Sequence, residues 1–297
     1  MKSINVGYEN INVEIIDYNT NIAKHAWECY RMTWNDLQNV EYSENDVRVQ
    51  KALYEIMYMK ALPMPREQAI ITFRINNISR VCLAQLTRQR KAAFNVESQM
   101  PRPVKHNVTI PLNYYHDEEL LKKAEKLVKE SQDLYDLAIS KGIPPQDARY
   151  LLMHSQTTSC VYVVDINTFV NSFGFRCENN LSDEINLVYR LCLSEFKKKL
   201  KNDKMNNIID NATYEFYMTI LQNCDCSGAK QHIGKNTDMV FGNSFKRFPD
   251  ANEEVTNATI NCDYDYKKSA WYYELKRLYD TKQNLLFYNE KEMIEKM

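Results

Sequence analysis

The sequence predicts a mixed α/β fold of the α+β class, in which strands are interleaved with longer helices. Three observations predict it. Apolar and polar residues alternate along 11–16, as they do in a half-buried strand. Two further segments, 69–75 and 157–164, are rich in β-branched and aromatic residues and are predicted as strands. Elsewhere apolar residues return every three or four positions, which is typical of amphipathic helices.

The first half of the chain contains two long predicted helices. One covers 21–59, and Pro63 and Pro65 follow it, where proline stops a helix. The other begins at Asp117, keeps a helical period of apolar residues and ends at Gly142.

The second half continues the alternation of strand and helix. Pro144 and Pro145 start a short helix, and Asp165 is the predicted N-cap of a helix over 166–175. A further helix is predicted over 183–201.

The last third of the chain is mixed in character. Beyond Asn211 the sequence predicts a helix, a polar loop region around 223–265 and a final helix over 267–288. We therefore divide the chain into a main domain, 1–210, and a C-terminal extension, 211–297, that belongs to the same globular unit.

The composition excludes several classes of protein. The 297 residues carry 38 Lys and Arg against 39 Asp and Glu, a formal net charge of -1, so the chain has no general attraction to nucleic acid or to an anionic membrane. The six glycines include no Gly-x-Gly spacing, which excludes the phosphate-binding loops of Rossmann and Walker sites. Any nucleotide must therefore be held by side chains, and arginine suits this best because its planar fork meets phosphate bidentately.

The eight cysteines are scattered, and several lie in apolar stretches where a free thiol packs as a small hydrophobic group. The chain begins without an apolar targeting segment, and no stretch is long and apolar enough to cross a membrane. We therefore expect a reduced, cytoplasmic protein without a membrane partner. Cys224, Cys226 and His232 are spaced too irregularly for a metal site, so no bound metal is expected.

The densest group of polar residues follows the strand predicted at 69–75. Within 85–91 arginines stand beside amide and hydroxyl groups rather than acids. Further polar residues come just after this segment: Asn95, Glu97, Ser98, Gln99 and Arg102. An isolated Arg-x-Arg is usually a solvated surface turn, but arginines accompanied by amides and hydroxyls are what an anion site requires.

Two arginines outside this segment are further candidates. Arg149 falls in the first turn of the short helix that begins at Pro144, where free backbone N–H groups and the positive end of the helix dipole favour an anion. An ion pair with Asp147 is the alternative. Arg176 lies at the end of the helix predicted over 166–175, where a cation also suits the negative end of the dipole.

Together these segments resemble a known family. Arg88-Gln89-Arg90 is followed by seven residues and then by Ser98, which is similar to the Arg-His-Arg, seven residues, Ser motif of the flavin-dependent thymidylate synthases. The Ile-Ser-Arg before it and Gln85, three residues ahead of Arg88, are also similar. The downstream block that begins DARYLLM and ends with Phe-Arg at Arg176 resembles the second block of the family. The resemblance covers roughly residues 60–200.

The resemblance implies a central mixed or antiparallel sheet flanked by long helices, and a homotetramer whose active sites are shared between subunits. It implies that flavin adenine dinucleotide (FAD) binds beside deoxyuridine monophosphate (dUMP). A one-carbon unit then passes from methylenetetrahydrofolate to C5 of dUMP, hydride from the reduced flavin completes the methyl group of dTMP, and NADPH reduces the flavin again. On the same ground 1–210 is the catalytic domain.

The resemblance also implies roles for particular residues. Arg176 is the implied catalytic residue, which stabilises negative charge on the pyrimidine ring as C5 becomes nucleophilic. The implied nucleotide contacts are Gln85, Arg88, Ser98, Gln99, Arg149 and Arg176. The implied flavin contacts are Arg88, Gln89, Arg90, Asn95, Asp165, Asn167 and Asn171.

Several positions depart from the family pattern. Gln89 replaces the motif histidine and keeps hydrogen bonding without a titratable ring. Met100 stands where an arginine is expected, with Arg102 as the candidate replacement. Asp165 stands where an asparagine is expected, and its carboxylate is unfavourable near an anionic cofactor unless it caps the helix or meets a cation. Three hypotheses stay open: thymidylate synthesis, methylation or hydroxymethylation of another pyrimidine nucleotide, and a non-catalytic binding or structural paralogue.

Overall fold

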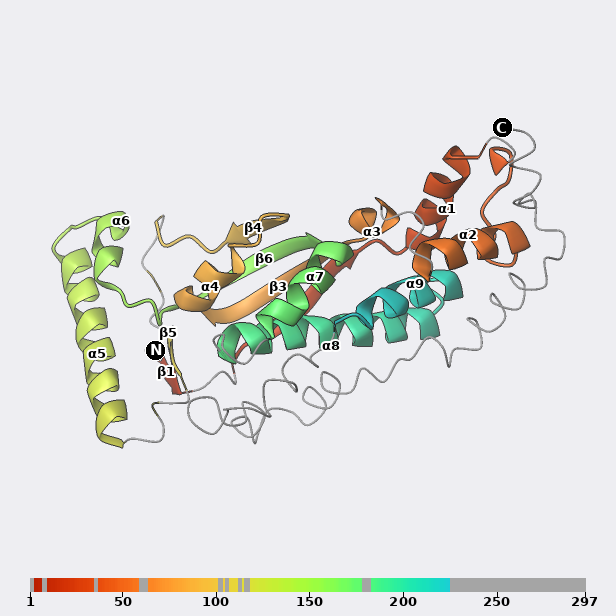
Figure 1. The fold of residues 1–297 in the computed structure, drawn as a ribbon. Helices are drawn as coiled ribbons and strands as arrows, with labels where there is room; N and C mark the ends of the chain where they lie inside the picture. Colours follow the sequence, from red (N-terminus) through yellow and green to blue (C-terminus); the bar gives the residue numbers. More distant parts are fainter. Residues whose placement is uncertain are drawn as a thin grey trace.

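The structure is a computed structural model that describes most of the chain up to residue 224 (Figure 1). The described residues are 3–6, 10–34, 37–58, 64–100, 104, 107–111, 114, 118–177 and 183–224. Arg102, most of the loop region predicted at 223–265 and the final helix predicted over 267–288 lie outside them.

A four-stranded antiparallel sheet occupies the centre of the described chain (Figure 1). Its strands lie in the order β2 (Asn12–Tyr18), β3 (Ile70–Ser79), β6 (Thr157–Asp165) and β4 (Ala92–Val96). The predicted strands 11–16, 69–75 and 157–164 are confirmed as β2, β3 and β6. The strand β4 was not predicted, because its short run of small residues lies within a polar segment.

One extra residue in β3 keeps two isoleucines on the same face of the sheet. Ile75 pairs with Cys160 and Ile78 pairs with Thr158, so β3 uses three residues where β6 uses two. Asn77 has a φ of 63°, in the left-handed region that asparagine tolerates better than most residues. Both isoleucines are fully buried, because this bulge restores the inward direction that strict alternation would reverse.

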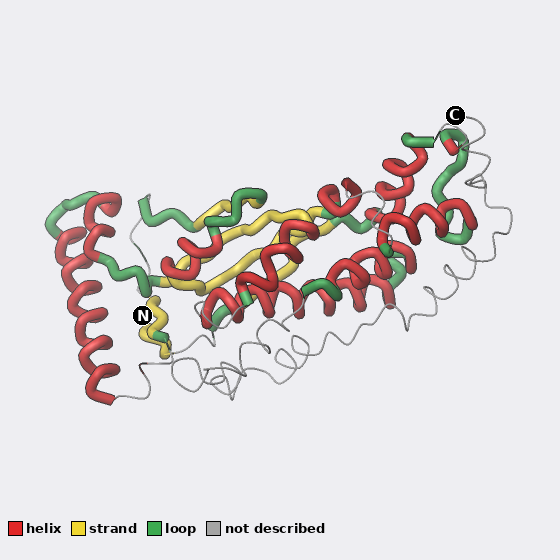
Figure 2. The backbone as a smooth tube through the Cα atoms, in the orientation of Figure 1, coloured by secondary structure: helices red, strands yellow, loops and turns green. Residues whose placement is uncertain are grey.

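Helices pack on the sheet and extend beyond both of its ends (Figure 2). They are α1 (Ile22–Met32), α2 (Val47–Met57), α3 (Met64–Gln68), α4 (Arg80–Leu86), α5 (Glu118–Ser140), α6 (Pro145–Ala148), α7 (Ile166–Arg176), α8 (Asp183–Met205) and α9 (Asn211–Leu221). The predictions over 117–142, 166–175 and 183–201 are confirmed as α5, α7 and α8, and the helix expected beyond 211 is α9. Within the described chain, none of these helices has the length and apolar character needed to span a membrane.

The prediction of one helix over 21–59 is wrong, because α1 and α2 divide this stretch. The side chain of Asp46 accepts the backbone N–H of Arg48 at 2.8 Å and caps the N-terminus of α2. Leu37 and Val40 lie between the two helices and are also buried. The apolar period therefore continues through the break and conceals it in the sequence.

The core lies between the sheet and helices α7, α8 and α9. Phe73 in β3 contacts Tyr162, Phe169 and Phe196, with ring centroids 5.8, 5.7 and 6.5 Å away. All four rings are fully buried, and aromatic pairs at these distances stabilise a fold beyond the area that they remove from water. This packing fixes the sheet against the helices that flank the candidate site.

Helix α5 stands beside one end of the sheet and has a small core of its own (Figure 1). Its Val128 packs on Val108 and Ile110 of β5 (Asn107–Ile110), which pairs in parallel with β1 (Ser3–Val6). Four leucines of α5, the α5 leucine stripe, are about half exposed: Leu120 at 45%, Leu127 at 55%, Leu134 at 48% and Leu137 at 51%.

Candidate active site

Helix α4 leads from the end of β3 toward the predicted site. The hydroxyl of Ser79 accepts the backbone N–H of Cys82 at 3.0 Å and so caps the helix. Cys82 and Leu86 are fully buried against the core, whereas Ala84 and Thr87 are exposed. Because the apolar side of α4 packs against the core, the opposite side of the helix faces a cavity.

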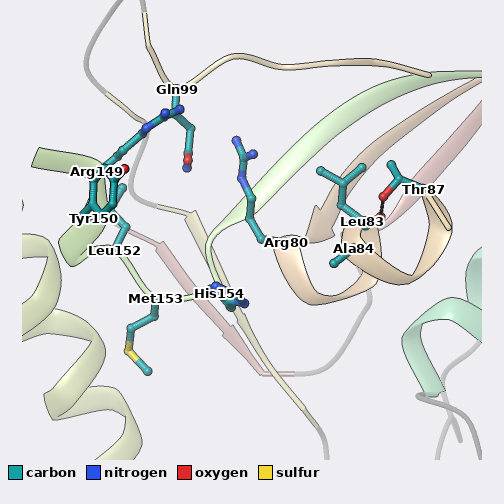
Figure 3. A pocket seen from close by; sticks show the side chains of 10 residues that line it. All are labelled: Arg80, Leu83, Ala84, Thr87, Gln99, Arg149, Tyr150, Leu152, Met153 and His154. Carbon is teal, nitrogen blue, oxygen red and sulfur yellow. Dashed lines mark hydrogen bonds between the residues drawn. The ribbon is translucent and has the colours of Figure 1, made fainter. Parts of the chain in front are cut away.

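This cavity has a volume of about 480 Å³ and lies between α4 and the segment that carries Arg149 (Figure 3). Its polar lining includes Arg80, Thr87, Gln99, Arg149 and His154. No carboxylate is among the described residues that line it, and its volume is within the range of small-molecule sites. The structure therefore places Gln99 and Arg149, two of the predicted nucleotide contacts, in one cavity.

The local structure at Arg149 differs from the prediction. Arg149 is the C-cap of the four-residue helix α6, so it lies at the end of that helix rather than in its first turn, and it opens a 3₁₀ turn. Its Nε donates to the backbone carbonyl of Gln146 at 3.1 Å rather than to the carboxylate of Asp147. A helix dipole therefore gives no support to an anion here, and the guanidinium itself provides the positive charge.

A second cavity of about 230 Å³ shares Arg80 and Gln99 with the first. Ser98, another predicted nucleotide contact, lines it together with Asn77 of the β3 bulge. The Ser98 hydroxyl accepts the backbone N–H of Met100 at 3.1 Å, which forms a tight local turn. Two separate segments of the chain, one around Arg80 and one around Gln99, thus meet at the shared edge of the two cavities.

Arg80 and His154 line the cavity although neither was a predicted site residue, and Arg80 belongs to the Ile-Ser-Arg segment. Arg80 lies between Gln99 and Arg149 on one side and the α4 side chains on the other (Figure 3). One Nη donates to the backbone carbonyl of Glu97 at 3.2 Å, whereas Nε is buried without a hydrogen-bond partner in the described structure. Burial lowers the pKa of Arg80, the carboxylate of Glu97 opposes this, and the charge of Arg149 lowers it further.

The nucleotide contacts predicted at Gln85 and Arg88 lie on α4 and just after it. The Oε1 atom of Gln85 is buried and accepts no hydrogen bond in the described structure. A buried acceptor without a donor is costly, so this oxygen suits a donor group from a ligand. Arg88 is exposed, and neither residue lines the two cavities described here.

Gln89, which replaces the motif histidine, uses its side chain inside the protein. Its Nε2 donates to the hydroxyl of Ser172 at 2.9 Å and to the carbonyl of Thr168 at 3.2 Å. Its Oε1 accepts the hydroxyls of Tyr162 at 2.5 Å and Tyr189 at 3.0 Å. These four hydrogen bonds use both N–H donors and both acceptor positions of the amide, so the side chain has no further hydrogen bond to offer a flavin.

The bonds of Gln89 place the turn around it against α7, the helix that carries Asn167 and Asn171. Arg88 and Arg90 are exposed on either side of Gln89, Asn171 is exposed and Asn167 is half-buried. The predicted flavin residues of this turn and of α7 therefore lie at one junction. Another of them, Asn95, is exposed on β4.

The carboxylate of Asp165 caps α7. Its Oδ1 accepts the backbone N–H of Thr168 at 2.8 Å, which confirms the predicted N-cap. This bond gives the charge a local partner, so the aspartate is accommodated where the family pattern has asparagine.

Arg176 lies in the last turn of α7 and is half-buried. Its guanidinium carbon is 5.4 Å from the ring centroid of the neighbouring Phe175. Arg176 is not among the residues that line the two cavities. A single chain therefore brings Gln99 and Arg149 together but leaves Arg176 outside their cavity.

No metal centre is visible in the part of the chain that the structure describes. In that part, no three His, Cys, Asp or Glu side chains come together as metal ligands. The six described cysteines are not joined in disulfides in this part of the chain. Cys226 and His232 lie outside the described residues.

Sequence comparison relates this chain to enzymes of nucleotide synthesis. The family model described as "Thymidylate synthase complementing protein" (Thy1) matches residues 14–200. The chain is 28% identical over 198 residues to a flavin-dependent thymidylate synthase of Pyrococcus furiosus, covering 64% of this chain and 80% of that protein. It is 31% identical over 148 residues to the same enzyme of Thermococcus onnurineus, covering 48% of this chain and 59% of that protein.

Structure comparison finds the same fold in a UMP/dUMP methylase, PolB, from Streptomyces cacaoi. The structure bound with 5-Br dUMP has a TM-score of 0.56 and 16% sequence identity, and the match covers 72% of this chain and 96% of that chain. The structure bound with 5-Br UMP has a TM-score of 0.53 and 15% identity, covering 74% and 98%. These likenesses support the fold.

Proposed function

Because this chain belongs to the flavin-dependent thymidylate synthase family, we propose that it is an enzyme that makes dTMP from dUMP. It transfers a one-carbon unit from methylenetetrahydrofolate to C5 of dUMP, and hydride from a reduced flavin completes the methyl group. The observation that carries the proposal is the cavity of about 480 Å³ that Gln99 and Arg149 share without a carboxylate among its described lining residues. Such a lining suits an anionic nucleotide.

The nucleotide is held by residues that line the two cavities, together with Gln85 on α4 and Arg88 just after it, which do not line them. The guanidinium of Arg149 binds the phosphate, since arginine meets phosphate oxygens bidentately. Ser98 and Gln99 add neutral hydrogen bonds at the edge where the two cavities meet. Gln85 offers its unpartnered oxygen to a donor of the nucleotide, and Arg88 adds a further cation.

Arg176 is the proposed catalytic residue. A fixed guanidinium beside the pyrimidine stabilises the negative charge that develops on the ring when C5 becomes nucleophilic. In one chain Arg176 does not line the cavity. We therefore assign it to an active site completed by a second subunit.

The residues at the junction of the 88–90 turn and α7 fit FAD. Arg88 and Arg90 are exposed guanidiniums that suit a diphosphate, and Asn167 and Asn171 supply amides on the adjacent helix. Asn95 is a further exposed amide of the proposed flavin site. When bound, the flavin supplies the hydride, with NADPH as the reductant that restores it. The side chain of Gln89 holds the 88–90 turn against α7 through its bonds to Thr168 and Ser172.

The α5 leucine stripe supports the proposed homotetramer. Leu120, Leu127 and Leu134 repeat at seven-residue spacing and Leu137 follows three residues later, a pattern that is typical of a helix face that packs against another chain. We also propose the cytoplasm as the compartment, since no disulfide joins the six described cysteines.

A second candidate substrate is UMP. The observation in its favour is that the fold is shared with a methylase whose solved structures hold 5-Br dUMP and 5-Br UMP. In this reading the cavity also accepts the 2′-hydroxyl of a ribonucleotide.

A reconstituted assay tests these proposals. The purified chain is incubated with methylenetetrahydrofolate, NADPH and either dUMP or UMP, and the nucleotide product is identified by mass spectrometry. We expect flavin absorbance in the protein and a methylated deoxynucleotide from dUMP. A hydroxymethyl product, or methylation of UMP alone, would replace the proposed reaction by one of the alternatives. A colourless protein that forms no product would support a non-catalytic paralogue.

A further inference from the structure

We infer that Asn186 and Arg190 of α8 are positioning residues, which hold the end of α7 so that the guanidinium of Arg176 keeps one place beside the pyrimidine ring. The inference rests on the proposed function and deepens it, because it names the groups that keep the proposed catalytic side chain in position. Neither residue belongs to the motifs that selected the site residues from the sequence.

The first step is the place of Arg176 at a helix end. Arg176 lies in the last turn of α7, and Cys177 is the C-cap of this helix. The backbone N–H of Cys177 donates to the carbonyl of Phe173 at 2.9 Å. The last carbonyl groups of a helix have no partner within it, and helix ends fray where no other group binds them. The backbone around Arg176 therefore needs support from another element.

Asn186 provides this support from α8, which packs against α7. Its Nδ2 donates to the backbone carbonyl of Cys177 at 3.0 Å. Asn186 is 8% exposed and Cys177 is 1% exposed, so water cannot readily replace a lost bond and the loss is costly. This bond joins the two helices at the residue that directly follows Arg176.

Arg190 determines which way the amide of Asn186 points. The Nε of Arg190 donates to Oδ1 of Asn186 at 2.5 Å, and Arg190 is buried as well. A guanidinium has only donors, so the amide oxygen must face Arg190 and the amide nitrogen must face Cys177. The flipped amide, whose oxygen would oppose the carbonyl of Cys177, is thereby excluded.

The charge of Arg176 acts on the same stretch of α8. Tyr189 lies between Asn186 and Arg190 on this helix and is buried. Burial raises the pKa of the Tyr189 hydroxyl, whereas its hydrogen bonds and the charge of Arg176 lower it. Tyr189 also donates to Gln89 at 3.0 Å. One stretch of α8 thus contacts both the end of α7 and the turn of the proposed flavin site.

The position of Arg176 matters because a guanidinium stabilises developing charge only where it is preorganised toward that charge. A displacement of about 1 Å can cost about 100-fold in rate, even when the cause lies away from the reacting atoms. A bond that fixes the backbone beside Arg176 therefore affects both the rate and the binding of the pyrimidine.

A purely structural role for Asn186 is the competing explanation. Its bond to Cys177 joins α7 to α8, and loss of that bond would lower stability whatever the residue at position 176. The two roles differ in one respect. Only the positioning role makes the effect of Asn186 depend on the guanidinium of Arg176.

A double-mutant cycle on the full chain separates the two roles. Its four proteins are the wild type, Asn186→Leu, Arg176→Ala and the double variant, and calorimetric titration measures the affinity of each for dUMP. We expect Asn186→Leu to weaken dUMP binding about 3- to 10-fold when Arg176 is present. In the Arg176→Ala background the same change should alter the affinity by less than about 2-fold.

Steady-state kinetics gives a second measurement. Asn186→Leu is expected to lower kcat about 10- to 100-fold in the assay with dUMP, methylenetetrahydrofolate and NADPH. Arg190→Lys keeps a donor for the amide of Asn186 and should be intermediate in both measurements. Asn202→Leu is the matched control, because Asn202 is an exposed residue of the same helix, and it should match the wild type.

Each other outcome has a definite meaning. Unchanged dUMP affinity in Asn186→Leu, or equal losses with and without Arg176, would overturn the positioning role and leave the proposed function standing. A wild type that shows the coupling in dUMP binding but forms no methylated product would overturn the proposed function and leave the positioning role standing. A wild type that does not bind dUMP would overturn both. Thermal melting monitors folding, and if Asn186→Leu does not fold, the cycle is made with Arg190→Lys.

Discussion

The hydroxyl of Tyr162 donates a hydrogen bond of 2.5 Å to Oε1 of Gln89, and this bond joins β6 to the turn after α4. Tyr189 of α8 donates to the same oxygen at 3.0 Å. A neutral amide can accept two phenols and still donate twice, whereas a neutral imidazole has one donor and one acceptor. The glutamine at this position therefore links the turn to β6, α7 and α8 at once.

Replacement of Gln89 by leucine is expected to lower the free energy of unfolding by about 1–3 kcal/mol, because two buried hydroxyls lose their acceptor. Urea denaturation measures this change. The double variant Gln89→Leu with Tyr162→Phe removes one of the stranded hydroxyls, so its loss should be smaller than the sum of the two single losses. Strictly additive losses would contradict the link.

Replacement of Asp165 by alanine is expected to cost about 1 kcal/mol of stability, because the backbone N–H of Thr168 loses its cap. Asp165→Asn should keep nearly all of the stability, since asparagine caps equally well. Thermal or urea unfolding of both variants makes the comparison. Equal losses in the two variants would mean that the charge, rather than the cap, is what the helix needs.

Glu184 on α8 is expected to make stability depend on pH. It is 4% exposed and accepts the backbone N–H and the hydroxyl of Ser79 at 2.6 and 2.5 Å. Burial raises the pKa of Glu184 despite these two bonds, which act in the opposite direction. The folded chain therefore binds this proton more tightly than the unfolded chain, in which the pKa of a glutamate is about 4.3. Stability conferred by this group is therefore complete below the unfolded pKa and declines as pH rises toward the folded pKa.

The variant Glu184→Gln removes this titration. Urea denaturation of both proteins at several pH values gives the difference in their free energies of unfolding. The stability of the wild type relative to the variant should fall with increasing pH and then become constant. A difference that grows with pH would show that the folded protein prefers the ionised carboxylate.

Replacement of Arg176 by alanine is expected to lower kcat about 100- to 1000-fold, as the loss of a preorganised charge at the reacting ring does in other enzymes. The side chain is only half-buried, so the fold should survive, as circular dichroism can verify. Steady-state kinetics with dUMP measures the effect. Turnover at the wild-type rate would remove Arg176 from the mechanism.

Replacement of Leu127 by glutamate is expected to break the proposed oligomer, because it places a charge in the middle of the α5 leucine stripe, at a side chain that is 55% exposed. Size-exclusion chromatography with light scattering measures the mass in solution. Lys129→Gln, an exposed change on the same helix, is the control and should leave the mass unchanged. A Leu127→Glu protein with the mass of the wild type would show that the stripe is not an interface.

The fold could be predicted for those elements whose sequence pattern depends only on neighbouring residues. The alternation along β2 and the β-branched residues of β3 and β6 are properties of neighbouring residues, and these strands are present. The break between α1 and α2 could not be predicted, because Leu37 and Val40 keep the apolar period across it. The strand β4 depends on its pairing with β6, about seventy residues further along the chain. The β-propensity of so short a segment does not reveal a pairing partner that is distant in sequence.

The candidate site was only partly visible in the sequence. Resemblance to the family selected Gln99 and Arg149, which share a cavity, but it also assigned the side chain of Gln89 to the flavin. Only the three-dimensional structure shows that Tyr162 and its neighbours occupy that amide. Arg80 was missed for a related reason, since its direction depends on the start of α4 and on the bulge that precedes it.

The extra residue of β3 determines which changes of length this part of the chain can accept. Loss of a single codon at Asn76 or Asn77 would leave Ile75 and Ile78 two positions apart, so ordinary alternation would still direct both side chains to the core. Loss of both codons would make the two isoleucines adjacent, and one of them would then turn to solvent. Homologues that lack one residue here can therefore keep this face of the core, whereas homologues that lack two should not.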